Sequence, residues 1–296
     1  MTLSCAHVII SHAPCLCSIL SKTPPDVLPA ANASDVAQCA SPDAPPPPAS
    51  WSLLPLHIPG ASLTQLAASL APLVPGLRLS THDVLAGLVW ALRCILAGVA
   101  PPGEQCSGRF IVALDLSANG LPPGVLPPDF TGNCAAALSV SAKAGGMDDA
   151  SADRHLLAVA NAAGAVRTAV AAYRAEPLNA VKHLLACGER TAGPAAPGSW
   201  KGVDAEPLVG FATSCLRVPT DALDCGTGPP VALHYSTLPL RSTSGLLFAS
   251  LAPGPHGDGA LVLLAASDTQ ARMLTASSGP AAELLRAAVP AARLLM

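Results

Sequence analysis

The most informative polar residues of this sequence lie in and just before a glycine-rich loop. The loop covers residues 224–230 and begins with the carboxylate of Asp224, followed by glycines in alternate positions and a proline pair. Glycine reaches backbone angles that other residues avoid, and proline prevents regular structure from continuing, so the spacing predicts a sharply turned loop. We expect Asp224, Gly226 and Gly228 to shape this loop rather than to react.

Two hydroxyl side chains, Thr213 and Ser214, precede the loop. Taken by themselves, such hydroxyls cap a strand or satisfy backbone groups. A metal site is not expected. The 10 cysteines include no Cys-x-x-Cys pair, and no histidine pair has the spacing of zinc ligands.

Composition limits the partners that this chain can bind. Only 12% of its 296 residues are charged, the net charge is −3, and no basic block is present. Clustered lysine and arginine bind nucleic acids and anionic membrane surfaces, so we expect neither as a partner. The most membrane-like window, residues 84–101, contains Arg93 and fits an amphipathic helix better than a span. The N-terminus does not show the basic segment followed by an apolar core that marks a secretory signal peptide. We therefore expect a cytoplasmic location.

Helix-start signals recur along the chain. Ser80 and Asp83 have the spacing of a capping box and precede an apolar stripe, which predicts an amphipathic helix over residues 81–98. A longer helix is predicted over residues 152–174. The capping-box spacing occurs twice more, at Ser62 with Gln65 and at Ser267 with Gln270.

Strand signals alternate with these helices. Short apolar runs predict strands at residues 109–116, 231–236, 246–251 and 260–266, and a hairpin-type loop at residues 253–259 joins the last two. The interleaving predicts an α/β or α+β layered domain with a mixed sheet and packed helices. No glycine-rich turn joins a strand to a helix, so a simple dinucleotide-binding fold is not expected.

A boundary is predicted near the start of the chain. Residues 23–50 contain two patches rich in proline and alanine and show no hydrophobic periodicity. This composition is typical of an extended crossover or linker. It separates residues 1–22 from a larger domain over residues 51–296.

Four segments, in order, resemble the BAHD acyltransferases, a plant-type family that uses coenzyme A thioesters. Residues 80–90, STHDVLAGLVW, are similar to the family's Ser-Thr-x-Asp/Glu-Ala-Leu-x-Ala-His-x-Trp helix. Residues 114–117, LDLS, resemble its Val-Asp-x-Arg strand end, and residues 126–133, LPPDFTGN, its Pro-Pro-x-Tyr-Phe-Gly-Asn turn. Residues 224–230, DCGTGPP, with the Thr-Ser pair upstream, resemble its Asp-Phe-Gly-Trp-Gly-Lys-Pro loop and Thr-Ser-Trp segment, without the aromatic residues.

The resemblance implies a chloramphenicol-acetyltransferase-like fold. It implies transfer of an acyl group from acyl-CoA, a co-substrate rather than a cofactor, to a small-molecule alcohol or amine. Thr213 and Ser214 would then lie near the bound substrate, and Asp224 would hold the loop. Family members have two such domains with the reaction between them. The resemblance covers the C-terminal half, so residues 1–22 are interpreted as a remnant of the first domain.

The family's general base is the histidine of a His-x-x-x-Asp motif in the first domain. His12 follows an apolar run and corresponds best to it, although Leu16 occupies the aspartate position. A neutral imidazole accepts the proton of the attacking oxygen or nitrogen, so His12 is the predicted catalytic residue. The alternative is that His12 is an ordinary histidine at the end of a strand. The incomplete motif and first domain support a second hypothesis, an inactive truncated homologue that acts as a binding or structural module.

Overall fold

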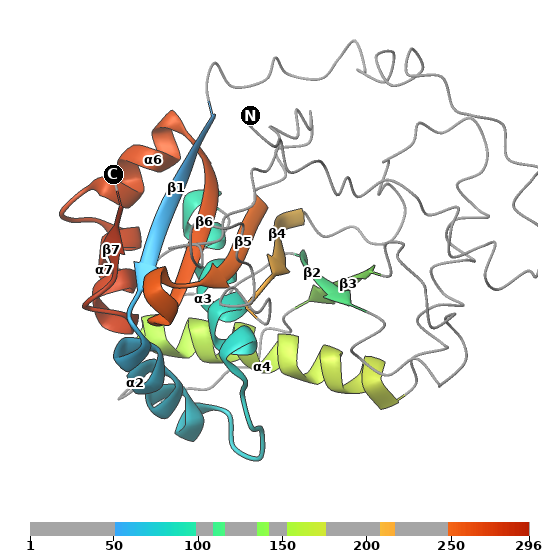
Figure 1. The fold of residues 1–296 in the computed structure, drawn as a ribbon. Helices are drawn as coiled ribbons and strands as arrows, with labels where there is room; N and C mark the ends of the chain where they lie inside the picture. Colours follow the sequence, from blue (N-terminus) through green and yellow to red (C-terminus); the bar gives the residue numbers. More distant parts are fainter. Residues whose placement is uncertain are drawn as a thin grey trace, which may run out of the picture. The chain divides into compact units, whose positions relative to one another are not determined.

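The computed structural model describes residues 51–98, 109–115, 135–141, 153–175, 208–216 and 248–295 (Figure 1). The chain divides into two compact units, and one of them, residues 1–41, 115–136 and 173–203, lies almost entirely outside these ranges. The elements below belong mainly to the other unit. The predictions for residues 1–22, the linker at 23–50, the strand at 231–236 and the loop at 224–230 concern residues outside the described ranges.

The described strands form one mixed sheet in the order β3-β2-β4-β5-β6-β1-β7. β4 runs parallel to β2 on one side and to β5 on the other, whereas β6 is antiparallel to both β5 and β1. The predicted α/β class with a mixed sheet is therefore confirmed. The strands are β1 (Trp51–Ile58), β2 (Arg109–Asp115), β3 (Ala135–Ser141), β4 (Leu208–Ser214), β5 (Phe248–Pro253), β6 (Ala260–Ser267) and β7 (Arg293–Leu294).

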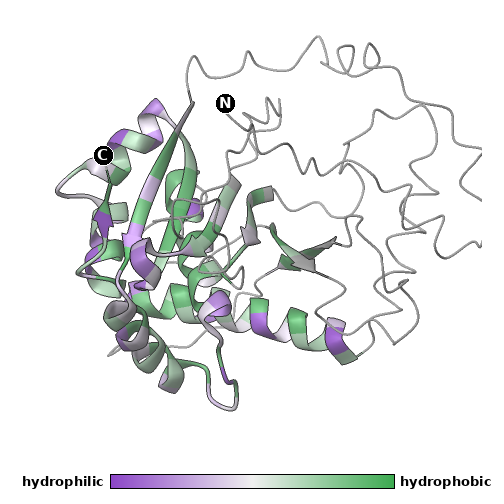
Figure 2. Cartoon of the chain, in the orientation of Figure 1, coloured by the Kyte–Doolittle hydropathy of each residue, from purple (hydrophilic) through white to green (hydrophobic). Residues whose placement is uncertain are grey.

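The helices pack around α3, which contacts β4 and β5 of the sheet as well as α2 and α7. Its residues are buried on nearly every side, as expected for a helix between a sheet and other helices. Apolar residues dominate β6, while α6 and α7 carry polar stripes (Figure 2). The helices are α2 (Gly60–Leu70), η3 (Ala71–Leu73), α3 (Thr81–Leu96), α4 (Arg154–Ala175), η5 (Pro255–Gly257), α6 (Asp268–Thr275) and α7 (Pro280–Ala288).

Two of the three predicted capping boxes are present. Ser80 accepts a hydrogen bond from the Asp83 N–H, and the Asp83 carboxylate accepts one from the Ser80 N–H at 2.8 Å. Ser267 and Gln270 form the same reciprocal pair at the start of α6.

The capping box predicted at Ser62 is wrong. α2 begins at Gly60, follows Pro59 and has no side-chain cap of its own, so Ser62 is buried inside the helix. The Gly60 N–H instead donates to Oδ1 of Asp258 at 3.0 Å. A carboxylate from the distant β5–β6 loop thus accepts a backbone N–H of the first turn of α2. The helix therefore starts two residues before Ser62, where the sequence predicted its cap.

α4 is long and apolar enough, by length and composition alone, to cross a membrane, the one such helix within the described residues. A core helix of a soluble protein passes the same test. Here Ala163 of α4 lies so close to α3 that a Cβ on Gly87 would be 2.7 Å from the Ala163 nitrogen. We therefore interpret α4 as a core helix that packs on α3.

Asp83 is a buried carboxylate, 1% exposed, at the start of α3. Burial by itself raises the pKa of Asp83, but His82 and the hydrogen bonds from the Ser80 hydroxyl and backbone favour the ionised form. Together they hold the pKa below its ordinary value of 3.8. Arg167 of α4 adds a cation, with 3.9 Å between its Nη1 and Oδ2 of Asp83.

We expect Asp83→Ala to lower the free energy of unfolding by about 1 to 2 kcal/mol at pH 7, because the N-cap partners of α3 are lost. A lowered folded-state pKa contributes stability above the unfolded pKa of about 3.9, and that contribution disappears as the pH falls through the folded-state pKa. Urea denaturation at pH 7, 5 and 3 should therefore show the difference between parent and variant shrinking below pH 3.8. A difference of equal size at all three pH values would contradict this account.

Candidate functional site

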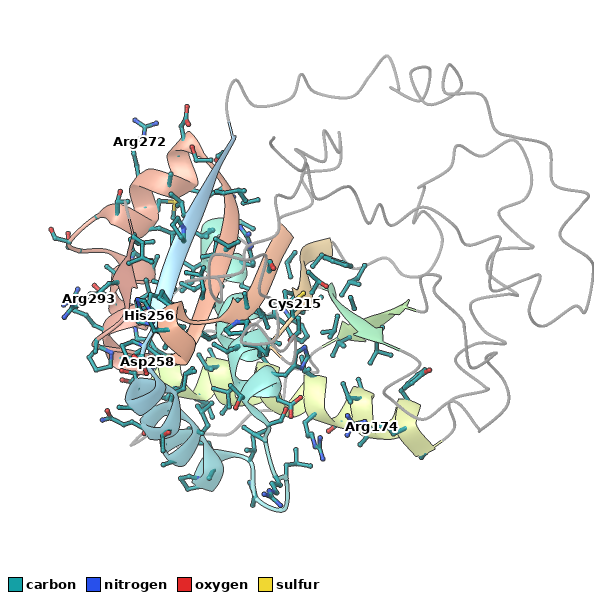
Figure 3. All side chains as sticks on the ribbon, in the orientation of Figure 1. Arg174, Cys215, His256, Asp258, Arg272 and Arg293 are labelled. Atoms are coloured by element: carbon teal, nitrogen blue, oxygen red, sulfur yellow. The ribbon has the colours of Figure 1, made fainter. Side chains whose placement is uncertain are left out.

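The candidate site lies at the carboxyl end of β4, where two parallel neighbours flank this strand. Ligands of open α/β sheets bind beyond the carboxyl ends of such strands. The Cys215 N–H donates to the Leu251 carbonyl at 2.7 Å, so pairing with β5 continues just past Ser214. Cys215 is labelled at this end of β4 in Figure 3. The sheet thus holds Thr213, Ser214 and Cys215 in a fixed backbone register.

Gly210 shows which face of β4 lies against α3. A Cβ at this position would lie 2.8 Å from the Phe110 ring and 3.2 Å from Cγ of Arg93, a residue of α3. Side chains alternate between the faces of a strand, so Ser214 shares the α3 side with Gly210. Thr213 faces the opposite side, away from α3. A ligand on that side meets Thr213, whereas Ser214 is accessible only from the strand end or the α3 side.

The α3 side of β4 is tightly packed. Trp90 of α3 stacks on Phe110 of β2 with 5.3 Å between ring centroids. Arg93 is fully buried, and burial lowers its pKa to about 9. A pKa of that size leaves the guanidinium charged at neutral pH, so a cation lies behind β4. This packing fixes the position of the strand that carries Thr213.

No motif in the sequence singles out Ser250, which the structure places beside Thr213. The two residues are register partners on the parallel strands β4 and β5, so their side chains share the face away from α3. Ser250 is 0% exposed, and its hydroxyl has no hydrogen-bond partner within the described residues. A serine inside the apolar run at 248–252 was the available signal. Its position beside Thr213 depends on strand register, which the sequence does not contain.

The loop between β5 and β6 has a structural role. Asp258 accepts the Gly60 N–H through its side chain, and its backbone carbonyl lies 3.0 Å from Nε2 of His57. Figure 3 shows His256 and Asp258 in this loop. Within the described ranges, no group of three or more histidine, cysteine, aspartate or glutamate side chains could hold a metal ion.

The structure does not test the other predicted site residues. His12, Asp224, Gly226 and Gly228 lie outside the described residues. Their roles as catalytic base and as loop-forming residues remain predictions. Of the predicted site, the structure places only the two hydroxyl residues of β4, and on opposite faces.

No family model matches the sequence, and no curated protein matches it. Solved structures do match its fold. Vinorine synthase aligns with a TM-score of 0.51 at 17% identity, over 76% of this chain and 46% of that one. F. graminearum TRI101 complexed with coenzyme A and T-2 mycotoxin aligns with a TM-score of 0.53 at 14% identity, over 79% of this chain and 49% of that one.

The chain has a chloramphenicol-acetyltransferase-like fold. Both of these proteins are BAHD acyltransferases, so the similarity supports the resemblance seen in the sequence at the level of the fold alone. The chain spans about half the length of each of them.

Proposed function

We propose that this chain is an acyltransferase that moves an acyl group from acyl-CoA to the hydroxyl or amine of a small molecule. The main support for this proposal is the similarity of the fold to that of acyltransferases. One of them, F. graminearum TRI101, was crystallised with coenzyme A and T-2 mycotoxin. The four sequence segments that resemble BAHD enzymes support the same function. We further propose a cytoplasmic location and acyl-CoA as co-substrate, without a resident cofactor.

The proposed reaction needs one base and one thioester. His12, as a neutral imidazole, accepts the proton of the acceptor hydroxyl or amine while that oxygen or nitrogen attacks the thioester carbonyl. The carbon–sulfur bond then breaks, and the coenzyme A thiolate leaves and takes up the proton. An ester or amide and free coenzyme A are the products, so atoms and charge balance.

Thr213 is the proposed substrate contact in the described part of the chain. Its side chain is partly exposed and lies on the face of β4 away from α3, on a strand paired on both sides. A hydroxyl fixed in this way donates a hydrogen bond to a polar group of the substrate. Ser214 is the second proposed contact, at the end of the same strand.

The proposed function is tested by thiol release and by binding. We expect the purified chain to release coenzyme A from acetyl-CoA, measured with a thiol-reactive dye, in the presence of a panel of small alcohols and amines. Calorimetric titration with coenzyme A alone should give saturable binding. Heat-denatured protein is the control for spontaneous hydrolysis.

Failure of both binding and release would refute the proposed function. Saturable binding without release from any acceptor would instead favour the second hypothesis, a homologue that binds its ligand but does not catalyse. The incomplete His-x-x-x-Asp motif around His12 is the observation that keeps this alternative open.

A further inference from the structure

Ser250 is a buried hydroxyl that makes no hydrogen bond in the described part of the fold. It is fully buried in the middle of β5, and within the described residues its Oγ has no hydrogen-bond partner. Buried hydroxyls are almost always hydrogen-bonded, because an unpaired one loses its bonds to water without replacement. An apolar residue would fill this position at lower free energy. The serine therefore points to a role outside packing.

The cross-strand neighbours of Ser250 restrict that role. Its register partner on β6 is Leu263, which is buried and apolar, and its partner on β4 is Thr213. Further along the same face, Ala252 forms a buried apolar cluster with Leu261 and Leu263. Among these neighbours, only Thr213 carries a group that can pair with the hydroxyl.

We propose that Ser250 is a positioning residue that orients the Thr213 hydroxyl toward bound substrate. Neighbouring strands lie about 4.8 Å apart, and two hydroxyls on facing side chains bridge this separation after rotation about their χ1 torsions. Thr213 is partly exposed and Ser250 is buried beside it. In the proposed arrangement Thr213 contacts the ligand, and the Ser250 hydroxyl donates a hydrogen bond to the Thr213 oxygen. This inference rests on the proposed function.

The arrangement limits how the Thr213 hydroxyl can turn. A threonine hydroxyl rotates freely and serves as donor or acceptor, so an exposed one is not committed to either role. Once its oxygen accepts a hydrogen bond from Ser250, its own proton is directed elsewhere, toward the substrate. Ser250 thus changes the rate by acting through Thr213, without touching the substrate.

A double-mutant cycle on kcat/KM for coenzyme A release tests this pairing, with acetyl-CoA and the most active acceptor of the panel. We expect Thr213→Val to lower kcat/KM about 10-fold and Ser250→Ala about 5-fold, the size of one neutral hydrogen bond. The double variant should be no slower than Thr213→Val alone, because Ser250 acts only through Thr213. The melting temperature of Ser250→Ala should equal or exceed that of the parent.

Two further variants separate the hydrogen bond from packing. Ser250→Cys keeps the size of the side chain but is a weak donor and acceptor, so it should lose as much activity as Ser250→Ala. Ser52→Ala removes an exposed hydroxyl from β1 of the same sheet and should leave kcat/KM unchanged.

The outcomes that overturn the inference differ from those that overturn the proposed function. Normal kcat/KM in Ser250→Ala, additive losses in the double variant, or a melting temperature that falls together with the rate would each refute the role of Ser250 while leaving the acyltransferase proposal intact. A parent chain that releases no coenzyme A would refute both proposals at once.

Discussion

His12→Ala is expected to lower coenzyme A release about 100- to 10,000-fold, because assistance by a general base contributes rate factors of that size. The loss should appear in kcat, since the base acts while the acceptor attacks the thioester. Coenzyme A release measured by thiol detection, together with calorimetric binding of coenzyme A, separates this effect from a loss of affinity.

Two control variants define what the His12 result means. His256→Ala removes an exposed histidine of the β5–β6 loop and should leave turnover unchanged. Asp224→Ala should lower the yield of soluble protein before it alters the chemistry, because a carboxylate that shapes a loop supports structure. Full turnover in His12→Ala would remove the catalytic assignment and favour the inactive-homologue hypothesis.

Gly87→Ala is expected to lower the free energy of unfolding by about 2 kcal/mol. Overpacking destabilises the fold by about 3 kcal/mol, whereas the higher helix propensity of alanine stabilises it by about 1 kcal/mol. The added Cβ would lie 2.7 Å from the backbone nitrogen of Ala163 and 2.8 Å from the backbone oxygen of Val159. Backbone atoms cannot rotate away, so α3 and α4 must separate. Urea denaturation followed by circular dichroism measures the effect.

Gly164→Ala is the matched control, since Gly164 is also a glycine inside a helix. Its added Cβ would meet only side-chain ends, 3.2 Å from Cγ1 of Val74 and 3.6 Å from Cδ1 of Leu77. These side-chain ends can shift, so we expect Gly164→Ala to change the free energy of unfolding by less than about 1 kcal/mol. Equal destabilisation by both substitutions would show that the α3–α4 contact is not specially tight at Gly87.

The sequence by itself determined the elements whose signals are local. The Ser80–Asp83 capping box marks the start of α3, and the Ser267–Gln270 pair marks the start of α6. The hairpin-type loop at 253–259 joins the antiparallel strands β5 and β6. In each case the interacting residues are only a few positions apart, so their chemistry can be seen in the order of the chain. The α/β class with a mixed sheet follows from the same alternation of local patterns.

Tertiary structure alone decided where β1 lies. No local pattern predicts a strand over residues 51–58, where Pro55 interrupts the apolar run and lacks a backbone donor. In the fold, β1 pairs with β6 across its length, and the Pro55 carbonyl accepts the Leu295 N–H on the other side. A residue's N–H and C=O point to the same side of a strand, so the missing donor of Pro55 falls beside the two-residue strand β7, away from the long ladder with β6.

Tertiary structure also decided the composition of the candidate site. Thr213 and Ser214 are adjacent in sequence, yet strand alternation directs their side chains to opposite faces. Ser250 lies far from Thr213 in the chain, yet strand pairing makes the two residues neighbours. Likewise, Asp258 begins α2 from a distant loop and overrides the local signal at Ser62. Register and long-range pairing are properties of the assembled sheet, and for this reason the sequence could name the hydroxyl of Thr213 but not the residue that lies beside it on β5.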